Sequence, residues 1–322
     1  MRGDEVREDQ RPDADTEPGE LAQEDDEVTK GTGAGVGGGK GVTSGSSWVV
    51  RISVLALCLL WTIPSIGLLV SSFRERTDVQ STGWWTAFAS PLDFTQWTLS
   101  NYDIVLFEND FAGAFVNSLI VTIPATLIPI SAAAFAAYAF SWMEFQGREV
   151  IFVIFVGLLV VPLQVAFVPF IRIFETLGIS GTFLSVWLAH TGFGMPLAVY
   201  ILRNYMGSLP REVIESAKVD GATQFQTFWR LIVPLSVPAL AAFTIFQFLW
   251  VWNDFLVALV FLGVTPDVKV VTVALAELIG SRGQDWHLLT AAAFITMIVP
   301  MIVFFSLQRY FVRGLTAGSV KG

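Results

Sequence analysis

The stretch Leu209–Ala239, LPREVIESAKVDGATQFQTFWRLIVPLSVPA, is a charged, amphipathic segment between two long apolar runs. Pro210 suits the first position of a helix, because its missing N–H costs nothing there. Glu212 then lies in the first turn, where it meets the positive end of the helix dipole. A narrow stripe of small or apolar residues recurs at helical spacing and consists of Pro210, Val213, Ile214, Ala217 and Gly221. The pattern predicts a short helix that can enter a groove on a partner.

A sharp turn and a second helix are predicted after this first helix. Gly221 follows Asp220 and can adopt the left-handed conformation that ends a helix. Asp220 is expected to cap the next helix by accepting a hydrogen bond from the N–H of Ala222 or Thr223. Large apolar residues then recur at helical spacing, at Phe225, Phe228, Trp229 and Ile232. We expect this aromatic face to lie on the membrane surface or on the helix bundle beneath it.

These residues resemble the EAA loop of the membrane subunits of binding-protein-dependent ABC importers. The resemblance rests on Glu215–Ala222, ESAKVDGA, followed by Phe225, Phe228, Ile232, Pro234 and Pro238. The usual second residue of the motif is alanine, and Ser216 is also small enough for a tight groove. In that family the loop is the coupling helix, which docks in a cleft on a cytoplasmic ATPase. The resemblance therefore implies a set of ATPase-coupling residues, namely Glu212, Glu215, Ala217, Lys218, Asp220, Gly221 and Ala222.

Residues outside the loop also resemble the sugar-transporting branch of this family. They are Ser72-Phe73, Phe94, Thr98–Tyr102, Asn117–Leu119, Pro162–Gln164, Pro169, Trp252–Phe255 and Asp285-Trp286. The ending Gln308–Gly322, QRYFVRGLTAGSVKG, resembles the short C-terminal tail of the maltose-type second permease subunit. The resemblance extends from about residue 50 to residue 322, so only the N-terminal tail lies outside it.

The composition is typical of a polytopic membrane protein. Of the 322 residues, 53% are hydrophobic and 13% aromatic, and the mean hydropathy is +0.61. The net charge of −9 comes mostly from residues 1–47, which hold 12 acidic and 5 basic residues. The rest of the chain is nearly balanced, so its charge indicates no nucleic-acid partner. The single cysteine, Cys58, cannot form an intrachain disulfide.

Two regions are predicted from the distribution of apolar residues. Residues 1–46 are acidic and glycine-rich with almost no large apolar side chain, so we expect a disordered tail. A six-span transmembrane domain is expected over residues 47–322, with the coupling loop at about residues 209–233. The glycine run Gly33–Gly41 departs from the phosphate-binding pattern at Ala34 and at Gly41. The sequence therefore predicts no nucleotide site in this run.

Six uncharged stretches are each long enough to cross roughly 30 Å of hydrocarbon. They are Ile52–Phe73, Phe111–Met143, Val150–Ile171, Thr176–Leu202, Leu231–Asn253 and Trp286–Gln308. The fifth is expected to continue past Asp254 to about Leu262. An N-terminus in the cytoplasm leaves ten Lys and Arg residues on the cytoplasmic side and five outside. We therefore expect a multi-pass protein of a prokaryotic plasma or inner membrane, with both termini and the two-helix loop in the cytoplasm.

No catalytic constellation is visible in the sequence. His190 and His287 have no His, Cys or carboxylate partner at the spacing of metal ligands. His190 is expected to be hydrogen-bonded within the helix bundle. The sequence therefore predicts a transport subunit without its own ATPase site, metal or cofactor, and not an enzyme.

Polar residues within the apolar runs are candidates for the translocation pathway. Asn253 and Asp254 lie near membrane depth, where a polar group normally faces a cavity or a polar partner. In one interpretation they line or support the pathway, and Trp250 or Trp252 offers a flat face to a sugar ring. In the other they stabilise a helix break or a hydrogen bond between helices. Weaker candidates of the same kind are Asn117, Gln164 and Gln247.

Together with the resemblance, the sequence predicts an all-α membrane protein of the type I ABC importer permease fold. The implied partners are a second homologous permease, two cytoplasmic ABC ATPase subunits that bind ATP and Mg, and an extracytoplasmic sugar-binding protein. An importer of another solute, such as glycerol phosphate or a polyol, remains open. An ion-coupled secondary carrier would need embedded carboxylates and usually an internal repeat. The chain offers one such candidate, Asp254, and no repeat. A receptor or scaffold without transport is a third possibility.

Overall fold

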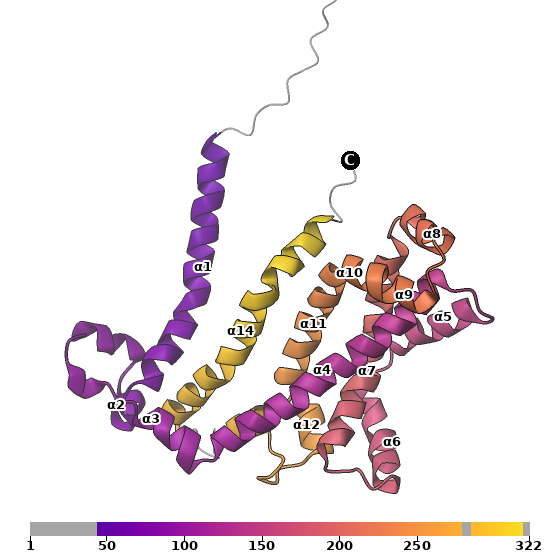
Figure 1. Ribbon diagram of the computed structural model, residues 1–322. Helices are drawn as coiled ribbons and strands as arrows, with labels where there is room; N and C mark the ends of the chain where they lie inside the picture. The colour runs from indigo at the N-terminus through magenta and orange to yellow at the C-terminus, as the bar shows by residue number, and fades with distance from the viewer. Residues whose placement is uncertain (1–43, 279–284, 318–322) are drawn as a thin grey trace, which may run out of the picture. The chain divides into compact units, whose positions relative to one another are not determined.

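The computed structural model describes residues 44–278 and 285–317, and all the named elements in these ranges are helices (Figure 1). The predicted disordered tail lies outside the described residues, except that Ser44–Ser46 begin the first helix. Four helices are long and apolar enough to cross a membrane. They are α1 (Ser44–Ser72), α4 (Phe111–Trp142), α7 (Phe183–Gly207) and α14 (Trp286–Ala317).

Two further spans are each made of bent helical pieces, which gives six spans if each bent pair is counted as one. The third span consists of α5 (Arg148–Leu158) and α6 (Leu163–Thr176), which meet at 105°. The fifth bends by 73° where Gln224–Leu235 joins α11 (Val237–Trp252). The chain then continues as α12 (Leu256–Phe261), as expected for a span that extends past Asp254. The prediction of an all-α, multi-span protein is confirmed.

The third and fourth predicted spans differ from the structure at their ends. The third was expected to run unbroken from Val150, but it breaks before α6 at Pro162, which lacks an N–H and disfavours a helical residue before it. The fourth was expected to begin at Thr176, but α7 begins only at Phe183. Gly178 and Gly181, with φ of 68° and 75°, form the turn in between. Both differences follow from backbone chemistry that an apolar run does not reveal.

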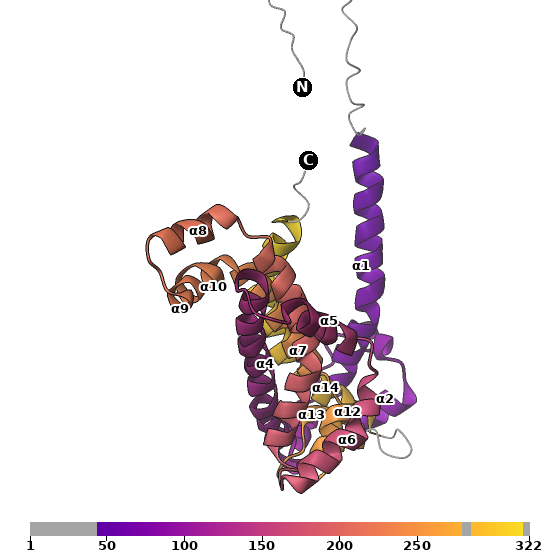
Figure 2. The same cartoon turned by 90° about the vertical axis from the view of Figure 1, so that its right-hand side faces the viewer.

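From Leu60 onward the chain forms one compact unit, in which α4 and α7 are the most extensively paired helices (Figure 2). Their contact is made close by alanines that are completely buried, including Ala125 and Ala133 of α4 and Ala198 of α7. Helix α11 packs on α4 and on α14. The residues before Leu60, which include the first half of α1, form a separate unit.

Short helices build the segment between α1 and α4. They are α2 (Arg76–Ser81), η1 (Trp84–Ala89), η2 (Phe94–Gln96), α3 (Ser100–Asp103) and η3 (Ile104–Glu108). The buried amide of Asn101 donates to the carbonyl oxygens of Ser72 and Arg74, both at 2.9 Å. The Arg74 guanidinium in turn donates to the Gly83 carbonyl oxygen and the Thr82 hydroxyl. These bonds fold the segment back on the end of α1. Helix α13 (Val271–Leu278) packs on α4 and α14.

Candidate functional site

The first helix of the predicted coupling loop is α8, Arg211–Val219. Pro210 lies just outside it, at the N-cap, and not at the first helical position. At the other end Gly221 has a φ of 77°, as predicted for a left-handed helix end. The Gly221 N–H donates to the Lys218 carbonyl oxygen at 3.1 Å, and the Ala222 N–H donates to the Ala217 carbonyl oxygen at 3.0 Å. These two bonds make a Schellman motif, which ends α8 and turns the chain sharply.

The cap of the second helix, α9 (Gln224–Thr227), differs from the prediction. Thr223 and Gln226 form a capping box, in which the Thr223 hydroxyl accepts from the Gln226 N–H and the Gln226 side chain accepts from the Thr223 N–H. The prediction that Asp220 caps this helix is therefore wrong. Asp220 is instead the exposed C-cap residue of α8. The Thr-x-x-Gln spacing is the local signal that identifies the true cap.

Part of the apolar stripe of α8 faces the protein's own helices. Ile214 is 1% exposed and packs in a core cluster with Met206, Phe228 and Ile232, while Ala217 is also buried. Two residues of the expected groove-entering stripe, Ile214 and Ala217, are thus used for internal packing, whereas Pro210, Val213 and Gly221 stay exposed. The face left for a partner is mostly charged. Its exposed residues are Arg211, Glu212, Val213, Glu215, Ser216, Lys218 and Val219, with Asp220 and Gly221 at its end and Ala222 half-buried.

The loop is attached firmly to the membrane helices. The Tyr138 hydroxyl of α4 donates a short hydrogen bond to the Gln224 side-chain oxygen of α9. Phe228 begins η4 (Phe228–Ile232), a π-helical turn, and its ring stacks on Phe135 of α4 at 4.6 Å. The indole N–H of Trp142 donates to the Met206 carbonyl oxygen near the end of α7. The loop is thus joined to α4 through α9 and η4, and α4 is joined in turn to α7.

Asn253 and Asp254 lie at the break between α11 and α12. The exposed Asn253 amide donates to the Leu249 carbonyl oxygen of its own helix at 2.7 Å. A carboxylate oxygen of Asp254 accepts from the Ala258 N–H at 3.1 Å, in the first turn of α12. The Asp254 carbonyl oxygen accepts from the Thr272 hydroxyl at 2.8 Å. Asp254 thus braces the break, while Asn253 offers its polar side chain outward.

The structure brings His190 to this break, which the sequence analysis missed. His190 of α7 is 1% exposed, and its Nε2 lies 3.8 Å from a carboxylate oxygen of Asp254. The imidazole also meets Trp250 edge-on, with ring centroids 5.3 Å apart. The partners are far apart in the sequence, so spacing could not reveal them. Within the described ranges, no three His, Cys, Asp or Glu side chains gather as a potential metal site.

Gln247 fills a space that only a glycine leaves open. Its buried amide donates to the Ala125 carbonyl oxygen of α4 at 3.2 Å. A Cβ added at Gly194 of α7 would lie 2.7 Å from the Gln247 side-chain oxygen. The side chain predicted as a weak pathway candidate therefore joins three spans inside the bundle.

We expect Gly194→Ala to lower the thermal unfolding midpoint of the detergent-purified protein, because the new methyl group displaces the Gln247 amide. Losing a buried hydrogen bond costs about 1–3 kcal/mol. Adding Gln247→Ala to Gly194→Ala should restore part of the loss, since it removes the clash. The four proteins form a double-mutant cycle. If the effects of Gly194→Ala and Gln247→Ala on stability were simply additive, the contact between residues 194 and 247 would be contradicted.

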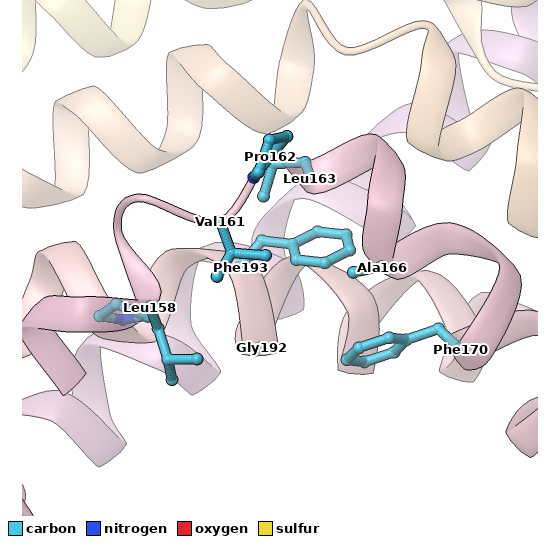
Figure 3. Close-up of a pocket in the computed structure, with 9 residues that line it drawn as sticks. Leu158, Val161, Pro162, Leu163, Ala166, Phe170, Gly192 and Phe193 are labelled. Atoms are coloured by element: carbon cyan, nitrogen blue, oxygen red, sulfur yellow. The ribbon is translucent and has the colours of Figure 1, made fainter. Parts of the chain in front are cut away.

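The two other pathway candidates occupy different places. The Asn117 amide of α4 donates to the carbonyl oxygens of Asp267 and Lys269, so it holds the segment between α12 and α13. Gln164 is exposed in the first turn of α6, directly after the 105° break. At that break lies an apolar cavity of about 160 Å³, lined by Pro162 and Leu163 at the break, by Leu158 and Phe170, and by Phe193 of α7 (Figure 3).

Comparisons with known proteins identify the family. GgtD of Synechocystis sp., an osmoprotective compounds uptake permease protein, is 59% identical over 84% of this chain and 91% of its own length. AglG of Rhizobium meliloti, an alpha-glucoside transport system permease protein, is 43% identical over 86% and 97%. A bacterial ABC transporter involved in the import of alginate shares the fold, with a TM-score of 0.64 at 23% identity over 83% of this chain and 96% of the solved one. Residues 126–317 match the family described as the binding-protein-dependent transport system inner membrane component, and the chain belongs to this family of multi-pass membrane proteins.

Proposed function

We propose that this chain is one of two permease subunits of an ABC importer for a carbohydrate or a closely related uncharged solute. The observation that supports this most is the way in which α8 and its loop are attached to the membrane helices. The exposed face of α8 is mostly charged, a hydrogen bond and an aromatic contact fix the same loop to α4, and Ile214 packs with Met206 of α7. A loop that is open to a partner on one side and rigidly joined to membrane spans on the other can pass force between them.

The proposed solute class rests on relatives and on charge. The two relatives above are named for osmoprotective compounds and for alpha-glucosides. Neither break carries a Lys or Arg in its own stretch of sequence, since residues 156–168 and 247–260 contain none. An anionic solute such as glycerol phosphate would lack a cationic partner at these breaks. The hydroxyl groups of a sugar, by contrast, can hydrogen-bond to amide side chains such as Asn253 and Gln164, and the apolar face of a sugar ring can pack on an indole ring.

We place the translocation pathway along the two breaks. Irregular backbone at membrane depth is tolerated only where protein covers it or where it lines a water-filled cavity. Between α5 and α6, Val160 is 83% exposed, and Gln164 follows in an otherwise apolar setting. At the second break, Asn253 is exposed and Asp254 is half-buried. Asn117 supports the pathway less directly, by holding the segment that leads into α13.

In the proposed mechanism ATP is bound and hydrolysed outside this chain. Two cytoplasmic ATPase subunits hold ATP and Mg, and each grips the α8 helix of one permease. Closure of the ATPases on ATP would move α8, and the contacts of Gln224 and Phe228 would pass the motion to α4. The pathway between the two permeases would then open outward, where an extracytoplasmic binding protein delivers the solute. The distribution of Lys and Arg favours cytoplasmic termini.

Charge reversal on α8 tests this proposal. We propose that Glu212 and Glu215 contact basic groups of the ATPase. Glu212→Lys combined with Glu215→Lys should then reduce both retention of the ATPase during purification and ATP-driven uptake by tenfold or more, because like charges that face each other across an interface cost several kcal/mol. Glu175→Lys, on the exposed end of α6, is the matched control and should leave both unchanged. Full retention and full uptake in the α8 variant would show that the ATPase does not bind there.

A further inference from the structure

Three aromatic rings form an exposed surface beside the coupling loop. This aromatic face consists of Phe135 of α4, Phe225 of α9 and Trp229 of η4, which are 46%, 67% and 48% exposed. Trp229 meets Phe135 edge-on at 6.0 Å and Phe225 edge-on at 6.1 Å. The rings therefore touch one another and present one continuous surface from two separate segments.

The aromatic face is held in place from behind. Phe228 and Ile232, on the opposite side of the same turn, are 3% and 0% exposed in the core. Phe228 stacks on Phe135, and the Tyr138 hydroxyl is bonded to Gln224. The segment therefore buries the apolar residues on one of its sides and exposes those on the other. The predicted aromatic face is thus two faces: Phe228 and Ile232 lie on the bundle, and Phe225 and Trp229 point away from it.

The position of the aromatic face along α4 indicates what covers it. Exposed apolar side chains follow α4 at helical spacing, at Val116, Ile120, Ile123 and Leu127, and Phe135 continues this outer surface. The 32 residues of α4 span about 48 Å, which exceeds the roughly 30 Å of hydrocarbon. The exposed apolar surface from Val116 to Phe135 covers about 28 Å of α4, close to the roughly 30 Å of hydrocarbon, so Phe135 lies near its boundary and the residues after it reach the headgroup region.

The charge around the aromatic face also fits a lipid surface. Arg230 is exposed beside Trp229 and is the one charged residue between Asp220 and Asp254. This segment thus offers a cation without any carboxylate, next to large aromatic rings. Helix α8, by contrast, exposes acidic and basic residues together, which suits a protein partner. Aromatic side chains and Arg together are enriched where a protein meets lipid headgroups.

We infer that the aromatic face and Arg230 lie in the headgroup layer of the cytoplasmic leaflet and bind anionic phospholipid there. The membrane would support α9 and η4 from the side, so that they keep their contacts with α4 when α8 moves. This inference rests on the proposed cytoplasmic position of the loop. A covering protein, such as a second permease subunit, is the rival that the experiment must separate.

Spin labels in the complete transporter distinguish these environments. In a Cys58→Ser background, single cysteines are placed at Phe225, at Trp229 and, as a control on α8, at Val219, and the transporter is reconstituted in phosphatidylethanolamine–phosphatidylglycerol vesicles. We expect the labels at positions 225 and 229 to collide with oxygen more than with a water-soluble nickel complex. The label at position 219 should not show this preference. Low collision with both reagents at 225 and 229 means a protein cover, and high collision with nickel means water, so either result overturns the inference.

Lipid dependence gives a second test that does not alter the rings. Uptake by the unmodified transporter should be higher in vesicles with phosphatidylglycerol than in vesicles without it, and Arg230→Gln should reduce that ratio by about fivefold, as expected for one cation at an anionic surface. Arg172→Gln, exposed on α6, is the control and should keep the ratio. An unchanged ratio in Arg230→Gln would overturn the role of Arg230. Labels at 219 and 229 that react with an impermeant reagent only from outside would instead overturn the proposed orientation.

Discussion

Replacing Gly221 by valine or proline is expected to abolish ATP-driven uptake while leaving the protein in the membrane. The φ of 77° at this position is left-handed, and a β-branched side chain there costs about 1–2 kcal/mol. Proline cannot adopt this φ, and it also removes the N–H that donates to the Lys218 carbonyl oxygen. Either change redirects the chain between α8 and α9, so α8 would approach the ATPase at the wrong angle. Solute uptake into vesicles and retention of the ATPase during purification measure the loss.

Two controls separate docking geometry from general strain. Gly221→Asn should keep most of the uptake, because asparagine tolerates the left-handed conformation better than other side chains. Gly263→Val introduces the same kind of strain at a φ of 86°, directly after α12. It should leave ATPase retention normal. Normal uptake by the valine and proline variants at position 221 would show that the turn at Gly221 is not needed for coupling.

Features that depend on neighbours in sequence were largely predictable. The glycine corner after α8 followed from one residue, because few others adopt a positive φ. The capping box of Thr223 and Gln226 was equally local, and it was missed because Asp220, also a good cap residue, stands nearer the turn. The bend before α6 needed Pro162 to be weighed as a break within an apolar run. Apolarity alone gives the length of a span but not its straightness.

Features that depend on packing were not accessible from sequence. The stripe on α8 could serve a partner or the protein's own core, and only the structure shows that Ile214 and Ala217 are buried while Val213 stays exposed. His190 and Asp254 meet because α7 and α11 pack together, and neither sequence neighbourhood contains the other residue. Gly194 gives no motif at all, yet its lack of a side chain makes room for Gln247.

When the two polar residues at the break after α11 are changed one at a time, we expect Asp254 to stabilise the break and Asn253 to contact the solute. Asp254→Leu removes the acceptor of the Ala258 N–H and leaves the buried His190 without its carboxylate neighbour. A buried polar group without a partner costs about 1–3 kcal/mol. We therefore expect a lower thermal unfolding midpoint in detergent together with loss of uptake. Asp254→Asn keeps an oxygen acceptor and should retain the stability.

Asn253→Leu should behave differently, because the Asn253 side chain is exposed and bonds only within its own helix. We expect a normal unfolding midpoint and normal ATPase retention, with uptake reduced by about tenfold, the effect of losing roughly 1.4 kcal/mol of solute interaction. Full uptake would place Asn253 outside the pathway, and loss of ATPase retention would make it a folding residue. If Asp254→Leu were as stable as the unmodified protein, the brace would be wrong. The two residues are adjacent in sequence, so opposite outcomes would show that the break uses one side chain for stability and leaves the other free for the solute.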